Sequence, residues 1–533
     1  MSSPKPVRVV ILGGGFAGIG AARELTRLGR QDISLEVHLV NNENYFVFQP
    51  LLPEVVSCSI EPSHILNPIR LLCPAARFHC ATVQELDLDA RRLTLVGVDV
   101  RHHYTLLYDH LVFGLGMRMN LSRIPGMPEH SLPLKTLGDA FQLRNHVLRC
   151  FEEAELMDDE TRRRRVLTVI VVGGGFSGVE TIGALYDMMR SVLPWYPRAR
   201  ATGCRAILIH SGERLLQELT VELGNFATTI LQRRGIEVLL KTSVKEATPD
   251  GVTLSTGESL SAGTVICTAG NSPHELFGTL GLPQERGRLL ADEYLRVRDR
   301  THLWAVGDNA LVPDVKRGGT CPPTAQYATR QGVRCARNIF AVIHGHPPLP
   351  FSFGGFGQLA SVGHHTGVGR LLGLNVSGVA AWFLWRSVYL AKVPGLRSKI
   401  QIGLDWLLEL LFPRNITMMD LQRTTQLKRA HYRPGDVICR QGDVGDHFYV
   451  IQAGEVEILR SENGTDTRVA IRSAGDSFGE LALLKKIPRT ATVRCLTSVD
   501  VILVTSHDFS TLVAGSRLFR TQMDQEAAIL ADK

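Results

Sequence analysis

The stretch VVILGGGFAGIGAARE, Val9 to Glu24, decides the fold of the N-terminal part of this chain. A run of β-branched apolar residues stops at three glycines, and a helix-forming pattern follows them. Gly13, Gly15 and Gly18 have the GxGxxG spacing, in which the first glycine makes a tight turn, the second admits a pyrophosphate and the third packs helix on strand. The N–H groups at the start of such a helix favour phosphate. We therefore expect a strand, a phosphate-binding turn and a helix.

A second copy of this unit follows. One glycine motif is a weak signal, because a glycine turn in any α/β unit can match it. The chain repeats the motif in LTVIVVGGGFSGVETIGA, Leu167 to Ala184, where Gly173, Gly175 and Gly178 have the same spacing. The fold class predicted is α/β, with two Rossmann-like domains that each bind a dinucleotide.

Length and composition are those of a globular protein with several domains. The chain has 533 residues, 44% of them hydrophobic and 21% charged, and a net charge of +7. This charge is too small to predict nucleic-acid binding, although it suits an anionic membrane surface. The ten cysteines form no CxxC pair, so we expect reduced thiols and no metal site. The N-terminal MSSPKP runs into a strand rather than a signal peptide, which predicts the cytoplasm.

The residue that ends the second strand of each unit is expected to meet a ribose, where an acid is usual. In the first unit this residue is Asn41, so either Asn41 itself or Glu43 would bind the ribose. In the second unit the strand ends at His210 and Ser211, which lack the carboxylate that would repel a 2′-phosphate. Because Arg214 is also close in sequence, NADPH is expected as well as NADH.

Segments outside the glycine units predict further elements. The aromatic and proline-rich residues 44–70 predict a binding loop, whereas alternation predicts strands over 78–94 and 103–116. A long helix is expected from Thr136 to Glu160. Its basic end, Arg162 to Arg165, is either a phosphate-binding patch or a solvated helix end.

Two later segments are candidates for lining a site. Asp308 follows a predicted strand and Gly307, and its carboxylate can accept hydrogen bonds from sugar or ribityl hydroxyls, although a surface Asp-Asn turn would look the same. Residues 322–343, PPTAQYATRQGVRCARNIFAVI, predict a helix that begins near Pro323 and Thr324.

Both glycine loops and the motifs FQPLLPEV, LVFGLG, GVE, CTAG, WAVGDNA and TAQYATRQG occur in the order typical of the type II NADH:quinone oxidoreductases, which residues 7–415 resemble. The resemblance implies FAD in the first unit, NADH in the second and a quinone as electron acceptor, without proton pumping. It also implies that Pro50 and Leu51 lie against the flavin and that Asp308 binds it.

The same resemblance implies residues on the substrate side. Glu180 would be the acid between nicotinamide and flavin, while Gln326 and Gln331 would border the quinone. A glutamate in the first turn of a helix is also favoured by the helix dipole, so Glu180 has a purely structural alternative. The chain departs from the family pattern at Asn41, at Pro53, where an aromatic residue is frequent, and at His210.

Residues 377–414 contain two helical stretches that Pro394-Gly395 separates. Neither has about 18 uninterrupted apolar residues, so we expect both to lie on a bilayer rather than span it. Residues 376–418 contain five Lys or Arg and two Asp or Glu, which gives this segment a net positive charge. Tryptophan side chains prefer the level of the lipid headgroups. Core helices or a dimer contact are the alternative. By helical spacing, Trp382, Trp385 and Tyr389 share one face of the first stretch, and Ile402, Trp406 and Leu410 share one face of the second. The charged residues that interrupt the apolar runs are Arg386, Lys392, Asp405 and Glu409.

From about Leu421 the chain predicts a small β-domain, because short strands alternate with glycine turns. The run FGELALL, followed by PRTATV, resembles the phosphate-binding cassette of cyclic-nucleotide-binding domains over residues 421–520. In that resemblance Gly479, Glu480 and Leu481 open the short helix, Glu480 takes the ribose hydroxyl and Arg489 grips the cyclic phosphate. Thr490 is the position that is informative about which base is bound. The expected ligand is cAMP, with cGMP as the alternative. A roll that has lost its ligand is the structural alternative.

The expected order of domains follows from these segments. Residues 1–130 and 276–376 would form the FAD domain and residues 131–275 the NAD(P)H domain. Membrane helices over 377–415, the cyclic-nucleotide domain over 421–520 and a tail over 521–533 would complete the chain. We expect a peripheral enzyme on the cytoplasmic face of a membrane, with a homodimer as one option.

Two other functions compete with this one. The flavin domain of a regulatory protein would only report redox state, but 28 residues after Thr505 are too few for a helix-turn-helix regulator. A sulfide:quinone oxidoreductase shares the fold but uses a pair of cysteines beside the flavin, and only Cys321 is a candidate here.

Overall fold

The computed structural model describes residues 6–31, 35–98, 102–418, 428–443, 447–462, 465–485, 487–505 and 509. The chain divides into two compact units, Met1–Met419 and Asp420–Lys533. The expected tail over 521–533 lies outside the described residues.

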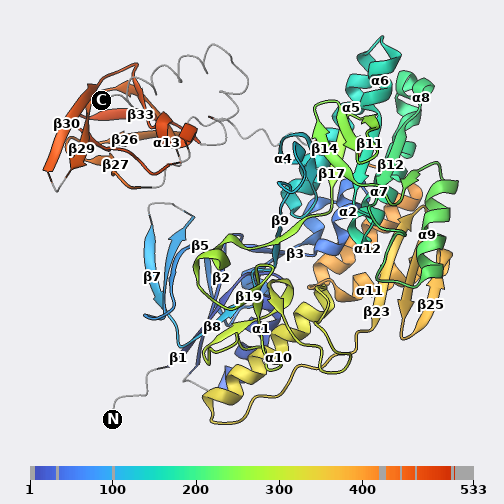
Figure 1. Cartoon of the computed structure of the whole chain (residues 1–533), viewed down its shortest axis with the longest axis horizontal. Coiled ribbons are helices and arrows are strands. Elements are labelled where there is room, and N and C mark those ends of the chain that lie inside the picture. Colours follow the sequence, from blue (N-terminus) through green and yellow to red (C-terminus); the bar gives the residue numbers. More distant parts are fainter. Residues whose placement is uncertain are drawn as a thin grey trace. The chain divides into compact units, whose positions relative to one another are not determined.

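A seven-stranded sheet forms the first half of the large unit, in the order β21-β8-β1-β2-β5-β6-β7 (Figure 1). The strands from β21 to β5 pair in parallel, and β5, β6 and β7 pair antiparallel. Helices α1 (Phe16–Leu28) and α10 (Ala325–Ile343) pack on each other, and a Cβ on Gly332 of α10 would meet Ala17 O of α1 at 2.1 Å. The strands are β1 (Val7–Leu12), β2 (Leu35–Asn41), β5 (Arg77–Asp87), β6 (Arg92–Gly97), β7 (His103–Leu107), β8 (His110–Phe113) and β21 (Leu303–Ala305).

A five-stranded parallel sheet, in the order β10-β17-β11-β12-β13, forms the second half. Its strand β11 leads into α7 as β1 leads into α1, which confirms the second Rossmann-like unit. The strands are β10 (Leu132–Pro133), β11 (Thr168–Val172), β12 (Arg205–Ile209), β13 (Glu237–Leu239) and β17 (Thr264–Cys267), and the helices are α5 (Leu137–Leu156), α6 (Glu160–Val166), α7 (Phe176–Val192), α8 (Pro197–Thr202) and α9 (Val221–Arg233).

The long helix expected from Thr136 to Glu160 is wrong in one respect, because two helices share this region. α5 ends at Leu156, and the side chain of Asp159 then accepts hydrogen bonds from the N–H groups of Thr161 and Arg162 to cap α6. A new N-cap starts a new helix.

Shorter helices and small sheets complete the large unit. The expected loop over 44–70 is partly regular, because β3 pairs with β4 around the short helix α2. These elements are α2 (Leu52–Val56), α3 (Ile69–Leu72), α4 (Met127–His130), β3 (Tyr45–Val47), β4 (Leu66–Pro68), β9 (Met117–Met119), β14 (Val244–Thr248), β15 (Gly251–Leu254), β16 (Ser259–Ser261), β18 (Asn271–Pro273), β19 (Gln284–Glu285), β20 (Arg288–Leu290), β22 (Ala310–Leu311), β23 (Gly357–Gly363), β24 (Thr366–Leu371) and β25 (Leu374–Ser377).

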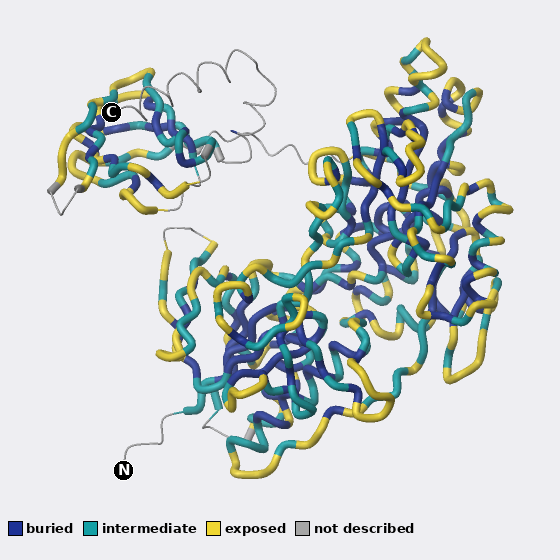
Figure 2. Tube along the Cα trace, viewed as in Figure 1, coloured by how far each residue is buried: buried dark blue, intermediate teal, exposed yellow. Residues whose placement is uncertain are grey.

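The core of the large unit follows the strands of the two main sheets (Figure 2). Val9, Val10, Ile11 and Leu12 are fully buried. A continuous apolar strand of this kind is typical of a parallel sheet covered on both faces, and each such side chain contributes about 1.5–3 kcal/mol on burial. This buried strand gives the glycine turn after it a rigid base.

Helices α11 (Gly378–Lys392) and α12 (Leu396–Leu411) are separated at Pro394-Gly395, as predicted. Their orientation differs from the prediction, because Trp382, Trp385 and Trp406 are buried in the protein instead of facing outward. The outward face of the two helices is apolar, with Phe383 60%, Leu404 51% and Leu408 49% exposed. None of the helices in the described ranges is long and apolar enough to cross a bilayer.

The small unit is a β-roll of two four-stranded antiparallel sheets, β26-β33-β28-β31 and β27-β32-β29-β30. A short helix, α13 (Glu480–Lys485), begins within the FGELALL run, as predicted. The strands are β26 (Lys428–Tyr432), β27 (Val437–Cys439), β28 (His447–Ala453), β29 (Val456–Glu462), β30 (Thr465–Arg472), β31 (Ser477–Phe478), β32 (Thr492–Cys495) and β33 (Val499–Thr505).

Candidate functional site

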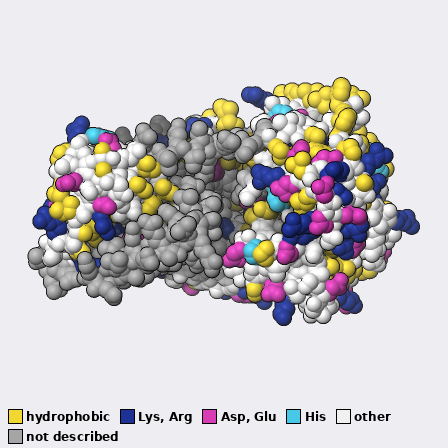
Figure 3. All heavy atoms as spheres, turned by 90° about the horizontal axis from the view of Figure 1, so that it is seen from above, with side chains coloured by type: hydrophobic (Ala, Val, Ile, Leu, Met, Phe, Trp, Pro, Cys, Tyr) yellow, Lys and Arg dark blue, Asp and Glu magenta, His cyan; other side chains and the backbone are white. Residues whose placement is uncertain are grey.

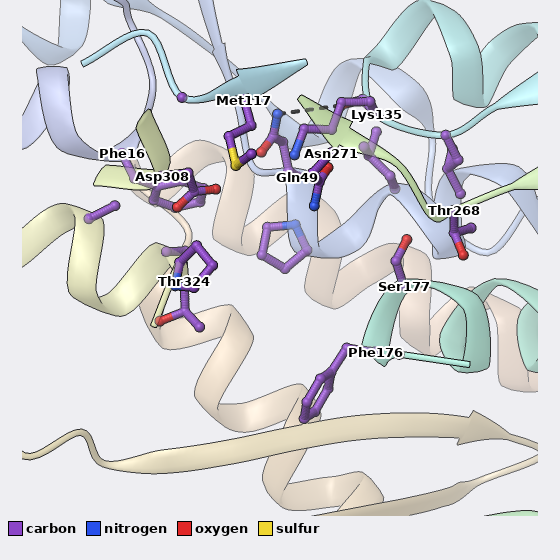
Figure 4. Close-up of a pocket in the computed structure, with 18 of the residues that line it drawn as sticks. Phe16, Gln49, Met117, Lys135, Phe176, Ser177, Thr268, Asn271, Asp308 and Thr324 are labelled. Atoms are coloured by element: carbon purple, nitrogen blue, oxygen red, sulfur yellow. Dashed lines mark hydrogen bonds between the residues drawn. The ribbon is translucent and has the colours of Figure 1, made fainter. Parts of the chain in front are cut away.

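One cavity of about 1840 Å³ in the large unit is lined by both glycine loops. In Figure 4, Asp308 and Thr324 lie at one end of the group of side chains, Ser177 and Thr268 at the other, and Gln49 and Asn271 between them. The side chain of Gln49 donates to Lys135 O at 3.4 Å. The cavity therefore connects the two places where the sequence predicts a dinucleotide.

Each glycine loop combines a tight turn with a close helix contact. Gly13 and Gly173 have φ of +102° and +118°, which favour glycine. Gly15 and Gly175 are the N-caps of α1 and α7, and a Cβ on either would meet nothing within 4 Å. Within the described chain, neither helix has a side-chain cap or an acidic first turn. Their N–H groups are arranged to bind an anion.

The ends of β2 and β12 make the same hydrogen bond in both units. Gly14 N donates to Asn41 Oδ1 at 2.8 Å, and Gly174 N donates to His210 Nδ1 at 3.2 Å. The Asn41 amide also donates to Glu43 O, so the side chain of Asn41 holds the loop, while Glu43 lines the cavity as the available carboxylate. Burial lowers the pKa of His210, which keeps the ring neutral with its proton on Nε2.

Arg214, which was expected to favour NADPH, is held within its own loop. The guanidinium of Arg214 donates to Leu219 O at 2.8 Å and to Gln217 O at 2.9 Å, so it fixes its own loop. Glu218, in the same loop, lines the cavity beside His210. A carboxylate next to the second glycine loop disfavours a 2′-phosphate.

Helix α10 fixes the turn at Gly307 and Asp308, which we call the GD turn. Gln331 is buried, and its Oε1 accepts a hydrogen bond from Gly307 N at 2.7 Å. Asp308 lines the cavity, and burial raises its pKa while Lys135 and Arg288 oppose that rise. Gln331 thus supports the Asp308 turn and does not line the cavity, contrary to its predicted place beside the quinone.

Two further predicted residues also lie behind the cavity wall. Leu51 is fully buried, while its neighbour Pro50 lines the cavity. Gly18 packs against Gly13, where a Cβ would lie 1.8 Å from the carbonyl oxygen. Gly178 makes the same contact with Gly173 and lines the cavity.

Glu180 is a buried acid on the cavity wall. Its Oε1 accepts hydrogen bonds from Trp385 Nε1 at 2.9 Å and from Ser361 N at 3.1 Å. It is the fifth residue of α7, so the first-turn alternative does not apply. Burial raises the pKa of Glu180 to about 8, so it is largely protonated at pH 7. An acid in this state can donate a proton to a bound substrate.

The far end of the cavity is aromatic and cationic. Gln326 donates to Gly357 O at 2.9 Å and accepts from Phe356 N, and the guanidinium of Arg330 lies 4.6 Å from the Phe356 ring centroid. Tyr389 and Lys392 of α11 also line the cavity. Sequence reasoning missed these two, because it assigned Tyr389 to the membrane face and read Lys392 as an interruption.

The β-roll brings together the residues of the predicted cassette. Arg489 is buried, and it donates to Gly479 O at 3.1 Å and to His447 O at 2.6 Å. Gly479 has φ of +93°, and a Cβ there would lie 2.4 Å from the Arg489 guanidinium. Glu480 is buried, Leu481 is half-buried and Thr490 is exposed.

Family profiles match three consecutive parts of the chain. The profile of pyridine nucleotide-disulphide oxidoreductases matches residues 7–332, that of the NDH2 C-terminal domain residues 356–415, and that of cyclic nucleotide-binding domains residues 429–516. The chain belongs to the pyridine nucleotide-disulphide oxidoreductase family. Together with the NDH2 C-terminal match, this confirms the type II NADH dehydrogenase assignment and the added cyclic-nucleotide domain.

Relatives cover the enzyme part of the chain. A demethylphylloquinone reductase of Synechocystis is 31% identical over 414 residues, 76% of this chain and 97% of that one. A type II NADH:quinone oxidoreductase of Mycobacterium tuberculosis is 29% identical over 440 residues, 79% and 92% of the two chains. The fold of NDH2 from Plasmodium falciparum, solved with NADH, matches with a TM-score of 0.72 at 19% identity and covers 78% of this chain and all of that one.

FAD and NADH are the cofactors of this family member, and the cavity fits them. A pyrophosphate fits at each glycine loop, because Gly15 and Gly175 each have open space at the Cβ position and each precedes a helix without a side-chain cap. All ten cysteines are free thiols, and the described residues contain no group of three or more metal-ligating side chains.

A matched pair of substitutions tests these two loops. Gly15→Leu should fold, because its Cβ meets no protein atom, but the protein should be colourless since the side chain fills the pyrophosphate site. Gly175→Leu should fold and stay yellow but should no longer be reduced by NADH. Flavin absorbance and thermal melting check both variants. Equal flavin loss in the two would contradict the assignment of the loops.

Proposed function

We propose that the chain is a membrane-peripheral NADH:quinone oxidoreductase whose activity responds to a cyclic nucleotide. The observation that carries the catalytic part is one cavity that both glycine loops, Glu180 and the aromatic and cationic residues around Phe356 line together. The first glycine loop and Asp308 would hold FAD, which would supply the acceptance of a hydride from NADH and the transfer of two electrons to the quinone. The aromatic end around Phe356 and Tyr389 is suited to a flat apolar ring.

The residues near the quinone end would supply protons and positive charge. Quinone reduction adds negative charge to the carbonyl oxygens, which a nearby cation stabilises. Lys392 lines this end, and burial and Arg330 lower its pKa. Glu180 would donate the proton from its protonated carboxyl. Gln326, fixed by its two backbone hydrogen bonds, would orient the ring.

Purified protein should oxidise NADH with a soluble quinone in a ping-pong pattern, because one flavin serves both substrates. NADPH should be the poorer donor, since Glu218 lines the nucleotide end. Initial-rate kinetics with NADH, NADPH and sulfide test this. Sulfide should give no reaction, because Cys321 is a single buried thiol that does not line the cavity. Flavin reduction by sulfide but not by NADH would refute the proposal.

Membrane binding would use the outward apolar face of α11 and α12. The space-filling view shows hydrophobic side chains gathered along one edge of the large unit (Figure 3). Three of the four charges that interrupt the helical sequence are paired within the protein: Asp405 pairs with His64, and Glu409 pairs with Arg386 and also with Arg414. Lys392, the fourth, lines the cavity instead. The exposed face is left apolar, which is the pattern of an interfacial helix. The cytoplasmic face and a homodimer stay predictions.

The double variant Leu404→Asp/Leu408→Asp should lose liposome binding at least about tenfold, because each leucine that a bilayer buries contributes on the order of 1.5–3 kcal/mol. Leu156→Asp is the matched control, since Leu156 is 82% exposed on α5, outside these helices. High salt should release the wild type only partly, because apolar burial is not screened. Cosedimentation with liposomes measures both, and equal binding by all three proteins would contradict this face.

The cyclic-nucleotide domain would bind its ligand through Arg489 and the start of α13. A guanidinium fixed by two carbonyls is already in place for a cyclic phosphate, and the helix start adds N–H groups. The exposed hydroxyl of Thr490 is suited to the base or the phosphate edge. The ligand proposed is cAMP, with cGMP as the alternative.

Arg489→Ala should weaken cyclic-nucleotide binding about ten- to a hundredfold, since a charge-assisted hydrogen bond is worth about 1.5–3 kcal/mol. Arg433→Ala, an exposed arginine of the same domain, should leave affinity unchanged. Calorimetry of the full chain with cAMP and with cGMP makes the measurement. An absence of heat with both ligands in the wild type would mean that the domain serves another role.

A further inference from the structure

A second buried carboxylate lies close to Glu180 and has no role in the function proposed above. Glu54 of α2 is only 8% exposed, as is Glu180. Its Oε2 accepts a hydrogen bond from Trp406 Nε1, just as Glu180 accepts one from Trp385 Nε1. The helices α11 and α12 thus each provide one indole N–H to one buried acid.

The two acids are close enough to interact. The rings of Trp385 and Trp406 lie 6.4 Å apart between centroids, and α2 packs directly on α7, which carries Glu180. A negative charge on Glu54 raises the pKa of Glu180. Glu54 itself does not line the cavity, so any action on the substrate has to pass through Glu180.

On its other side, Glu54 faces a cluster of ions. Glu409 accepts from Arg386 and from Arg414 at 2.8 Å each, and Ser59 donates to the same carboxylate at 2.8 Å. Arg386 lies between the rings of Trp382 and Trp406. The side chains of Arg386, Glu409 and Arg414 are 11%, 14% and 14% exposed, so water reaches this cluster.

The proposed reaction needs a proton from water. NADH, one proton and the quinone give NAD⁺ and the quinol, so NADH supplies two electrons and one proton and the solvent supplies the other. Glu180 lies behind α11, whose Trp385 bonds to it, and the outer face of α11 and α12 is apolar. A buried acid with an ionic cluster behind it offers a path.

We propose that Glu54 relays this proton, taking it from water at the Arg386–Glu409–Arg414 cluster and passing it to the carboxylate of Glu180, which delivers it to the quinone. The O–H bond of Glu54 breaks and that of Glu180 forms, and the two arginines stabilise the Glu54 carboxylate that is left. The inference rests on the proposed function, because it needs quinone reduction at the Glu180 end of the cavity.

The balance of charges around both acids suits a proton relay. Burial raises the pKa of Glu54 to about 7, with Glu409 raising it further and Arg386, Trp406 and Arg414 lowering it. Burial raises that of Glu180 to about 8, with Ser361 and Trp385 lowering it and Glu54 raising it. Burial raises the pKa of both acids toward neutrality, so both groups can exchange protons near neutral pH.

The test compares two electron acceptors in Glu54→Gln, which keeps an oxygen for Trp406 Nε1 but cannot exchange a proton. The rate with quinone should fall at least about tenfold, whereas the rate with ferricyanide, which accepts electrons without protons, should stay at the wild-type value. Asp405→Asn is the matched control, because it removes a carboxyl of the same helix pair that bonds to Glu61 and His64. Its ratio of quinone to ferricyanide rates should equal that of the wild type.

A second variant keeps the acid and moves its pKa. Trp406→Phe removes the N–H that lowers the pKa of Glu54, so the alkaline fall of the quinone rate should shift to higher pH. An unchanged acceptor ratio in Glu54→Gln, or an unshifted limb in Trp406→Phe, would overturn the relay while the wild type still reduced quinone. A wild type that reduced ferricyanide but not quinone would overturn the proposed function and the relay together.

Discussion

The close approach of a helix backbone to a strand turn at two glycines determines the geometry of the enzyme unit. A Cβ on Gly18 would lie 1.8 Å from Gly13 O, and one on Gly178 would lie 1.7 Å from Gly173 O. Because only glycine permits this contact, α1 and α7 start at fixed positions over the ends of β1 and β11. The two helix starts line the same cavity, so backbone packing, rather than any flexible side chain, sets how the dinucleotides face each other.

Features encoded in consecutive residues could be predicted from the sequence. Both glycine units, the GD turn at Asp308 and the short helix of the cassette are of this kind, and the structure has each where the pattern predicts it. The side-chain roles of Asn41 and Gln331 were not predictable in this way. Each binds a backbone N–H of a glycine in a turn, and the same amide in an open loop would be free for a ligand.

The orientation of α11 and α12 shows a second limit. Periodicity tells which residues share a face, but it does not tell which face meets the protein. Trp382, Trp385 and Trp406 were expected at the lipid headgroups, yet the protein buries them because two of their indoles have carboxylate partners far away in sequence. Trp406 and Glu54 are 352 positions apart, and no local sequence pattern predicts such a pair.

Stability alone is a poor explanation for the ionic cluster of Arg386, Glu409 and Arg414 beneath the apolar face of α11 and α12. Well-packed apolar residues in place of largely buried ion pairs are often as stable or more so. Arg386 adds a further cost, since its Nε is buried without a hydrogen-bond partner among the described residues. Its guanidinium lies 4.1 Å and 4.8 Å from the Trp382 and Trp406 ring centroids, which offsets only part of that cost. A group of this kind is better explained by what charge does there: it keeps a buried acid able to ionise next to an apolar surface that would otherwise hold every carboxyl neutral.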